Sequence, residues 1–257
     1  MECGVPYLPF GRTSVSDDEL RDMINIASAV NITSELGVRN PGGRISALID
    51  CLPNLLLWLE ENGRRYPWRE TTDPWRIYLT EILLQRTRAD AVEKIYDEFF
   101  DRFPDPQALY GASDTEIRET VHSLGLVNHR TRTLREISNL CVNHGGVPHS
   151  IYKLKQPWRV GEYSARACQL FARGEPLALV DTNFARVFGR VLGNKMPEQP
   201  HKNVVVYSLL DALTPDEPAV ARAFNLAILD LGAKICTPSS PRCRICPLSA
   251  GCRSCRT

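Results

Sequence analysis

The sequence lacks the features that would place the chain in a membrane or outside the cell. No apolar run reaches the roughly 18 residues that a membrane-spanning helix needs. The first residues, MECGVPYLPFGRTSVSDDE, contain no basic stretch followed by an apolar core, so they do not resemble a secretory signal. We therefore expect an intracellular protein, either cytoplasmic and nucleoid-associated or nuclear, with no membrane partner. Its nine cysteines then lie in a reducing compartment, where disulfides are rare.

A strong excess of charge of either sign is also absent. The formal net charge of the 257 residues is +1, which alone does not indicate a nucleic-acid partner. The charges are unevenly placed, however. Residues 1–50 hold seven acidic and four basic residues, whereas residues 234–257 hold five basic residues and no acidic one. A basic end on a balanced chain is a local electrostatic patch that attracts nucleic acid, although a solvated terminus has the same composition.

Patterns typical of β-strands are missing, and helical patterns take their place. We find no convincing run of alternating apolar and polar residues bounded by turn residues. Apolar residues recur instead at helical spacing, as in residues 45–61, where Pro53 either kinks the helix or marks its true start. Residues 31–43 are expected to form a linker. Asp73 followed by Pro74 is typical of the start of another helix. The sequence therefore predicts an all-α protein of one large or two small domains.

Five of the cysteines crowd into the last 22 residues of the chain. Cys236, Cys243, Cys246 and Cys252 follow the spacing C-x6-C-x2-C-x5-C. Four thiolates in a short, loop-rich segment indicate a metal site, and the ligand type alone allows either a zinc ion or a [4Fe–4S] cluster. Cys255 is a fifth cysteine that does not fit this spacing.

Residues 157–183 combine a tight turn, a helix and an acidic residue at the start of the next helix. The helix that follows Gly161 begins with backbone N–H groups that lack intrahelical partners, and such groups bind phosphate well. The same residues are also compatible with an ordinary tight turn. An apolar run then ends at Asp181. This residue is either only the N-cap of the next helix or a carboxylate that takes part in chemistry.

These segments together resemble the iron–sulfur branch of the helix-hairpin-helix DNA glycosylases, the superfamily of endonuclease III and MutY. The resemblance is carried by the cysteine spacing and by the segments PWRETTDPWRIYLTEILLQRT, VDTNFARVFGRV and FNLAILDLGAKIC. It implies a [4Fe–4S] cluster held by Cys236, Cys243, Cys246 and Cys252. It also implies a role in base excision repair, with double-stranded DNA containing a mismatched or damaged base as the partner. We expect the protein to act as a monomer.

The resemblance further implies two helical domains with a helix-hairpin-helix motif. Residues 72–178 are expected to form a six-helix domain that contains the hairpin. Residues 44–71 and 179–257 are expected to form a discontinuous helical domain that ends in the iron–sulfur loop, and residues 1–43 an N-terminal extension.

Three catalytic residues follow from the resemblance. Asp181 matches the catalytic Asp of the family, where a fixed carboxylate stabilises the positive charge that builds on the sugar or steers a water molecule. Glu81 aligns with the Glu that contacts the base. A desolvated Glu has a raised pKa and can donate a proton to a leaving base, whereas a lone Glu on a helix is usually solvated. Tyr163 stands where bifunctional members carry a Schiff-base lysine, so we expect a monofunctional glycosylase without strong AP-lyase activity. Tyr163 is otherwise a packing residue.

The expected DNA contacts lie on two segments. In relatives, the segment of Gln85 and Arg86 supplies side chains that fill the gap left by a flipped base. In the family the hairpin sequence is usually Leu-Pro-Gly-Val-Gly, and in this chain residues 157–161 are Pro-Trp-Arg-Val-Gly. Arg159 replaces the first Gly, which strains the turn by about 1–2 kcal/mol if this position needs a positive φ. The expected DNA-binding residues are Gln85, Arg86, Trp158, Arg159, Val160, Gly161 and Ser164.

Two branches of the family compete as models for the substrate. MutY removes adenine opposite 8-oxoguanine, and the other branch removes thymine or uracil opposite guanine. The chain ends five residues after Cys252, without the domain by which MutY reads 8-oxoguanine. It also has Arg86 where MutY tends to have a second Gln, and Thr182 where MutY usually has Gly. We therefore favour thymine or uracil opposite guanine and keep a MutY-like adenine glycosylase as the alternative.

Two hypotheses from other classes remain open. One is a non-catalytic iron–sulfur protein that binds DNA, which would need neither Asp181 nor Glu81. The other is an interaction module held together by zinc.

Overall fold

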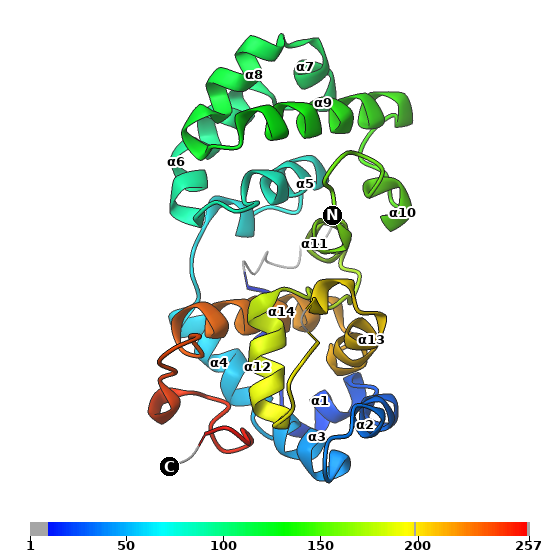
Figure 1. Ribbon diagram of the computed structural model, residues 1–257, viewed down its shortest axis with the longest axis vertical. Coiled ribbons are helices and arrows are strands. Elements are labelled where there is room, and N and C mark those ends of the chain that lie inside the picture. The colour runs from blue at the N-terminus through cyan, green and yellow to red at the C-terminus, as the bar shows by residue number, and fades with distance from the viewer. Residues whose placement is uncertain (1–9, 198, 256–257) are drawn as a thin grey trace, which may run out of the picture. The chain divides into compact units, whose positions relative to one another are not determined.

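The computed structural model describes residues 10–197 and 199–255, and every regular element in these residues is a helix. The predicted all-α fold is confirmed. The chain divides into two compact units (Figure 1). The first unit comprises the chain up to Arg64 and from Gly174 onward, and the second comprises Arg65–Arg173. The division predicted from the sequence placed these boundaries after residues 71 and 178. Among the described residues, no helix combines the length and the apolar character needed to cross a membrane.

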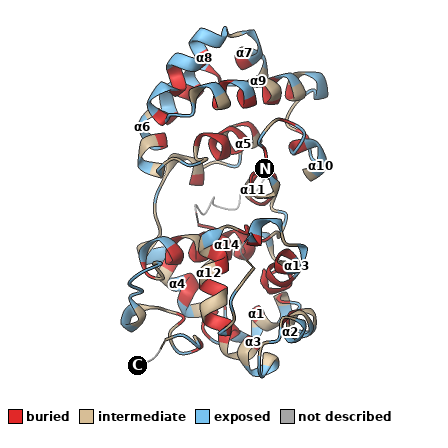
Figure 2. Ribbon diagram, in the orientation of Figure 1, coloured by how far each residue is buried: buried red, intermediate tan, exposed pale blue. Residues whose placement is uncertain are grey.

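The first unit is built around α14 (Pro218–Lys234), which has twelve buried residues. A helix that is buried on most sides suits the centre of a helical unit. It packs against α4 (Leu52–Asn62) and α12 (Thr182–Leu192), and Figure 2 marks the buried positions of all three helices in red. The other elements of this unit are α1 (Asp17–Met23), α2 (Ile26–Glu35), α3 (Pro41–Ile49), η3 (Pro200–Lys202), α13 (Val204–Leu213) and η4 (Cys243–Ile245).

The segment expected to be an N-terminal extension contributes helices to the first unit. Helix α2 packs against α13 and α3, and its Ala29 and Thr33 side chains are buried. The expected linker at 31–43 contains the end of α2 and the start of α3, because the Asn40 side chain caps α3 by accepting a hydrogen bond from the backbone N–H of Gly43 (3.3 Å). Residues 1–9 of the expected extension lie outside the described residues.

The single helix expected over residues 45–61 is two helices, α3 and α4, which are separated at Asp50 and Cys51. Pro53 lies in the first turn of α4. It therefore marks the start of a helix and does not kink one, because a first-turn residue has no intrahelical acceptor for its N–H group.

Helix α5 (Pro74–Leu83) is the central helix of the second unit, and eight of its ten residues are buried. As predicted, Asp73 caps it by accepting a hydrogen bond from the backbone N–H of Trp75 (2.9 Å). It packs against α11 (Glu162–Arg173) and α9 (Val127–His144). The remaining elements are η1 (Pro67–Arg69), α6 (Ala89–Arg102), α7 (Pro106–Gly111), α8 (Asp114–Val121), η2 (His122–Leu124) and α10 (Ile151–Leu154). Residues 65–173 thus contain seven α-helices where six were expected.

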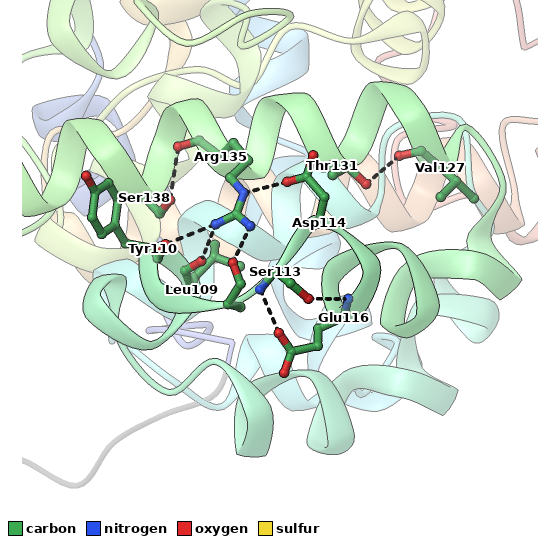
Figure 3. A network of polar contacts seen from close by, with 10 residues as sticks. Leu109, Tyr110, Ser113, Asp114, Glu116, Val127, Thr131, Arg135 and Ser138 are labelled. Atoms are coloured by element: carbon green, nitrogen blue, oxygen red, sulfur yellow. Dashed lines mark hydrogen bonds and ion pairs between the residues drawn. The ribbon is translucent and has the colours of Figure 1, made fainter.

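Arg135 joins three helices at one end of the second unit (Figure 3). From α9 its guanidinium donates to the carbonyl oxygens of Leu109 (3.1 Å) and Tyr110 (3.0 Å), and also to that of Ala112. It forms an ion pair with Asp114 on α8 (2.8 Å). The last carbonyls of α7, which have no partners within their own helix, therefore find donors on α9.

Candidate functional site

Asp181 ends a buried apolar segment of the first unit and caps α12. Residues 178–180 are fully buried, and the backbone N–H of Leu179 donates to the side chain of Asn225 on α14 (2.8 Å). One carboxylate oxygen of Asp181 accepts from the backbone N–H of Phe184 (2.8 Å), and the other accepts from the side chain of Asn183 (2.9 Å). Both oxygens are thus held in place. Burial raises the pKa of Asp181 above its ordinary value, although these hydrogen bonds oppose the shift.

A chain of polar contacts fixes Asn183 in turn. Arg186, one turn further along α12, donates to the side-chain oxygen of Asn183 (2.7 Å) and to the carbonyl oxygens of Gly232 (2.7 Å) and Cys236 (2.7 Å). A Cβ atom at Gly232 would lie 2.6 Å from the Cβ atom of Asn183, so glycine lets the end of α14 approach this closely. The Asp181 carboxylate is therefore connected to the cysteine loop. The sequence analysis did not single out Arg186, although its spacing from Asn183 is that of neighbours on one helix face.

Glu81 and Tyr163 belong to the second unit, on the packed helices α5 and α11. Glu81 is 9% exposed. Burial raises its pKa to about 8, although the charge of Arg69 opposes the shift. Of the two alternatives for Glu81, the structure has the desolvated one, and burial favours the protonated side chain. Tyr163 is half-buried in the first turn of α11.

Three loops of the second unit hold a non-glycine residue in the left-handed backbone region: Arg86 (φ 54°), Leu126 (φ 48°) and Arg159 (φ 61°). This conformation costs about 1–2 kcal/mol per residue and persists only where the surroundings fix it. The positive φ considered for Arg159 is confirmed. The Gln85 side chain donates to the carbonyl oxygen of Arg159 (3.2 Å), and Gln85, Leu126 and Arg159 line one small cavity of about 10 Å³. The structure thus brings the three loops together.

Leu126 is an apolar side chain that the sequence analysis did not select. It is 40% exposed and precedes the first turn of α9. An exposed apolar residue in a strained backbone, beside the predicted DNA-binding residue Gln85, is a further candidate for contact with DNA. The Leu-Gly-Leu sequence at 124–126 is the pattern from which Leu126 could have been identified as a candidate.

The buried Arg130 side chain holds two of these loops in place by hydrogen bonds. It is 3% exposed and lies on α9. Its guanidinium donates to the carbonyl oxygens of Leu83, Gln85, Leu124 and Gly125 and to the hydroxyl of Thr87. All five acceptors are neutral, and burial lowers the pKa of Arg130. A buried cation therefore fixes the end of α5 and the loop before Leu126 through neutral acceptors.

Trp158 of the hairpin is held by its neighbours. The guanidinium carbons of Arg132 and Arg159 each lie 4.6 Å from the centre of the indole ring, and the ring of His129 lies 5.0 Å from it. The backbone N–H of Trp158 donates to the carboxylate of Glu136 (2.6 Å). The indole is thus fixed among cationic groups, which suits a rigid basic surface.

The other predicted hairpin contacts differ in exposure. Arg159 and Gly161 are exposed. Val160 and Ser164 are only 7% and 5% exposed, so the surface that the hairpin presents is made by its other residues.

The predicted cysteine ligands surround one cavity of the first unit. Cys236, Cys243, Cys246 and Cys252 all line a cavity of about 90 Å³, together with Arg190 of α12. Arg190 donates to the Cys236 sulfur (3.3 Å) and to the carbonyl oxygens of Thr237 (2.8 Å) and Pro238 (2.7 Å). Arg190 therefore ties the first predicted ligand and the start of the cysteine loop to α12.

The arrangement of these thiols bears on the kind of metal site. Within the described ranges, no three cysteine, histidine or acidic side chains are placed to hold a single ion. A zinc site needs four sulfurs at about 2.3 Å from one point. A [4Fe–4S] cluster binds four thiolates through separate irons, and four thiols around one cavity are the donor set that such a cluster uses.

Comparisons with known proteins agree with this geometry. Residues 79–205 match the HhH-GPD superfamily of base excision DNA repair proteins. A thymine-DNA glycosylase of Aeropyrum pernix is 39% identical over 214 residues, which cover 82% of this chain and 95% of the relative. An adenine DNA glycosylase of Mycobacterium tuberculosis is 34% identical over 202 residues, which cover 76% of this chain and 64% of the relative. The solved structure of a thermostable thymine-DNA glycosylase is similar with a TM-score of 0.71 at 33% identity, over 79% of this chain and 93% of that one.

Proposed function

The chain belongs to the HhH-GPD superfamily of base excision DNA repair proteins and is a DNA glycosylase, and we propose that it hydrolyses the N-glycosidic bond of thymine or uracil opposite guanine. The substrate is supported by the thymine-DNA glycosylase relative, which is more identical to this chain and more fully covered than the adenine DNA glycosylase. The observation that carries the catalytic proposal is the Asp181 carboxylate, both of whose oxygens are fixed by hydrogen bonds.

Asp181 stabilises the transition state in this proposal. Breaking the N-glycosidic bond leaves positive charge on the sugar, and a fixed carboxylate opposes that charge without reorganising. The hydrogen bonds from Phe184 and Asn183 hold the oxygens before substrate arrives. Because Asp181 is largely removed from water, its ionised carboxylate is poorly solvated, which raises its pKa and strengthens its interaction with a nearby positive charge.

Glu81 supplies the proton in this proposal. A pKa of about 8 leaves the carboxyl group protonated at neutral pH, so it can donate a hydrogen bond or a proton to the departing base. Tyr163 supplies no amine, so no Schiff base forms with the sugar, and we expect hydrolysis without strong AP-lyase activity.

The three strained loops carry the DNA contacts in this proposal. Arg86 and Arg159 place cations on the surface, and the N-terminus of α11, after Gly161, is where a phosphate binds in this proposal. Gln85 and Leu126 occupy the space in the duplex that a flipped nucleotide leaves.

The cofactor in this proposal is a [4Fe–4S] cluster held by Cys236, Cys243, Cys246 and Cys252. When bound, such a cluster ties four points of the loop together and adds local charge. The loop in turn contacts α12 through Arg190 and Arg186, so the cluster would stabilise the helix that Asp181 caps.

A panel of duplexes tests the substrate. Purified protein is incubated with duplexes containing U·G, T·G, A opposite 8-oxoguanine, or only normal pairs, and base release is measured after alkaline cleavage. We expect release from U·G and T·G. Release only from A opposite 8-oxoguanine would favour the adenine glycosylase, and release from none of them would favour a DNA-binding protein without activity.

A further inference from the structure

The fifth cysteine of the C-terminal loop forms a second pair with ligand spacing. Cys243 and Cys246 are separated by two residues in the pattern C-x2-C, and so are Cys252 and Cys255. This spacing is common in metal-binding pairs. The loop therefore carries one thiol more than a four-cysteine site uses.

The fold brings Cys255 back to the other cysteines. The backbone N–H groups of Arg253 and Ser254 donate to the carbonyl oxygens of Val191 (3.0 Å) and Arg190 (3.2 Å), and the Ser254 hydroxyl also donates to Arg190 (3.0 Å). These bonds fasten the end of the loop to the last turn of α12. A turn bond from the N–H of Cys255 to the carbonyl oxygen of Cys252 (3.3 Å) then directs Cys255 inward.

The Cys255 thiol lies beside Cys243. It donates to the carbonyl oxygen of Cys243 (3.8 Å) and lines the same cavity as the four predicted ligands. Cys236, by contrast, contacts Arg190.

From this placement we propose that Cys255 is a reserve ligand, which takes the place of Cys243 on the cluster when the Cys243 bond is broken. The inference rests on the proposed cluster. In the exchange the iron–sulfur bond to Cys243 breaks and its thiolate takes up a proton, while the Cys255 thiol releases a proton and bonds to the same iron. No electron is transferred, so no oxidant or reductant is needed.

The test compares iron and acid-labile sulfide per chain in purified full-length variants. Cys255→Ala is expected to contain as much iron as the wild type, and Cys243→Ala most of it, because Cys255 replaces the lost ligand. The double variant Cys243→Ala with Cys255→Ala is expected to lose the iron. Cys236→Ala is the matched control, and it is expected to lose its iron although Cys255 is present. Alanine is used because serine can itself bind iron.

A second measurement covers the case in which Cys243→Ala does not fold. Wild type and Cys255→Ala are exposed to a ferrous chelator, and the loss of visible absorbance is followed. Faster loss from Cys255→Ala supports the inference. It is overturned by equal rates, by Cys243→Ala losing iron as fully as Cys236→Ala in folded protein, or by the double variant keeping as much iron as Cys243→Ala. A wild type that contains no iron would overturn the proposed cluster itself.

Discussion

Replacing Glu81 with glutamine is expected to make the protein more stable and less active at neutral pH. Burial in α5 raises the pKa of Glu81 from 4.5 to about 8, against the opposing charge of Arg69. The folded protein therefore keeps a proton that the unfolded chain releases between these two pH values. Because the unfolded state binds fewer protons in this window, the free energy of unfolding falls as pH rises from 4.5 to 8.

The size of this effect follows from the two pKa values. At pH 7 the unfolded chain is ionised at Glu81 and the folded protein is mostly protonated, so ionisation lowers the free energy of unfolding by about 3 kcal/mol, and by about 5 kcal/mol above pH 8. Glutamine resembles the protonated side chain and has no proton to lose. The Glu81→Gln variant is thus expected to match the wild type at pH 4 and to be about 3 kcal/mol more stable at pH 7.

Urea denaturation of both proteins at several pH values between 4 and 8, followed by far-ultraviolet circular dichroism, measures this difference. Titrations elsewhere in the chain cancel in the comparison. Glu93→Gln is the matched control, because Glu93 is exposed on the neighbouring helix α6. The free energy of unfolding of this variant is expected to differ little from that of the wild type at every pH. If the difference in free energy of unfolding between Glu81→Gln and the wild type did not change with pH, the reasoning would be refuted. The same variant is expected to release base at least about 100-fold more slowly if Glu81 is the proton donor.

Three further predictions concern the loops and the DNA contacts. Arg130→Met is expected to lower the free energy of unfolding by about 3 kcal/mol in urea denaturation, because several buried carbonyls lose their donor, whereas the exposed Lys94→Met is expected to change it little. Arg159→Gly is expected to raise the free energy of unfolding by about 1 kcal/mol, because glycine tolerates the positive φ. The same preparation is expected to bind DNA more weakly. A variant less stable than the wild type would contradict the conclusion that Arg159 is strained. The dissociation constant for duplex DNA in fluorescence anisotropy is expected to rise steeply with salt, and a flat response would argue against phosphate contacts.

The sequence predicted those parts of the molecule that depend on local patterns. Helical spacing and the Asp73–Pro74 start gave α5 correctly, because caps and first-turn prolines act within a few residues. Pro53 allowed two interpretations, and the sequence could not choose between them because kinked helices and helix starts both accept proline. Part of the expected linker at 31–43 is helical because the helices of the first unit pack against it, which is a tertiary effect.

In the candidate site, too, features that depend on local sequence could be predicted, and those that depend on tertiary contacts could not. The sequence left Glu81 either desolvated with a raised pKa or solvated, and it considered a positive φ at Arg159 as a condition; the structure has the raised pKa and the positive φ. Arg130 could not be anticipated, because a single arginine on an amphipathic helix is usually solvated and only the folded structure buries it against carbonyls. The contact of Arg186 with Asn183 likewise depends on α14, which lies far along the chain.

The most direct test of the central claim is the rate of base release by Asp181→Asn under single-turnover conditions on a U·G duplex. Asparagine is as good an N-cap as aspartate and keeps the bond from the Phe184 N–H, but its NH2 group cannot accept from Asn183, so the variant is expected to fold with a loss of about 1 kcal/mol of stability. The rate is expected to fall by at least about 100-fold, because the negative charge opposite the sugar is lost. The exposed Asp216→Asn, with the same chemical change in the first unit, is expected to keep the wild-type rate. An Asp181→Asn variant that releases uracil as fast as the wild type would contradict the account.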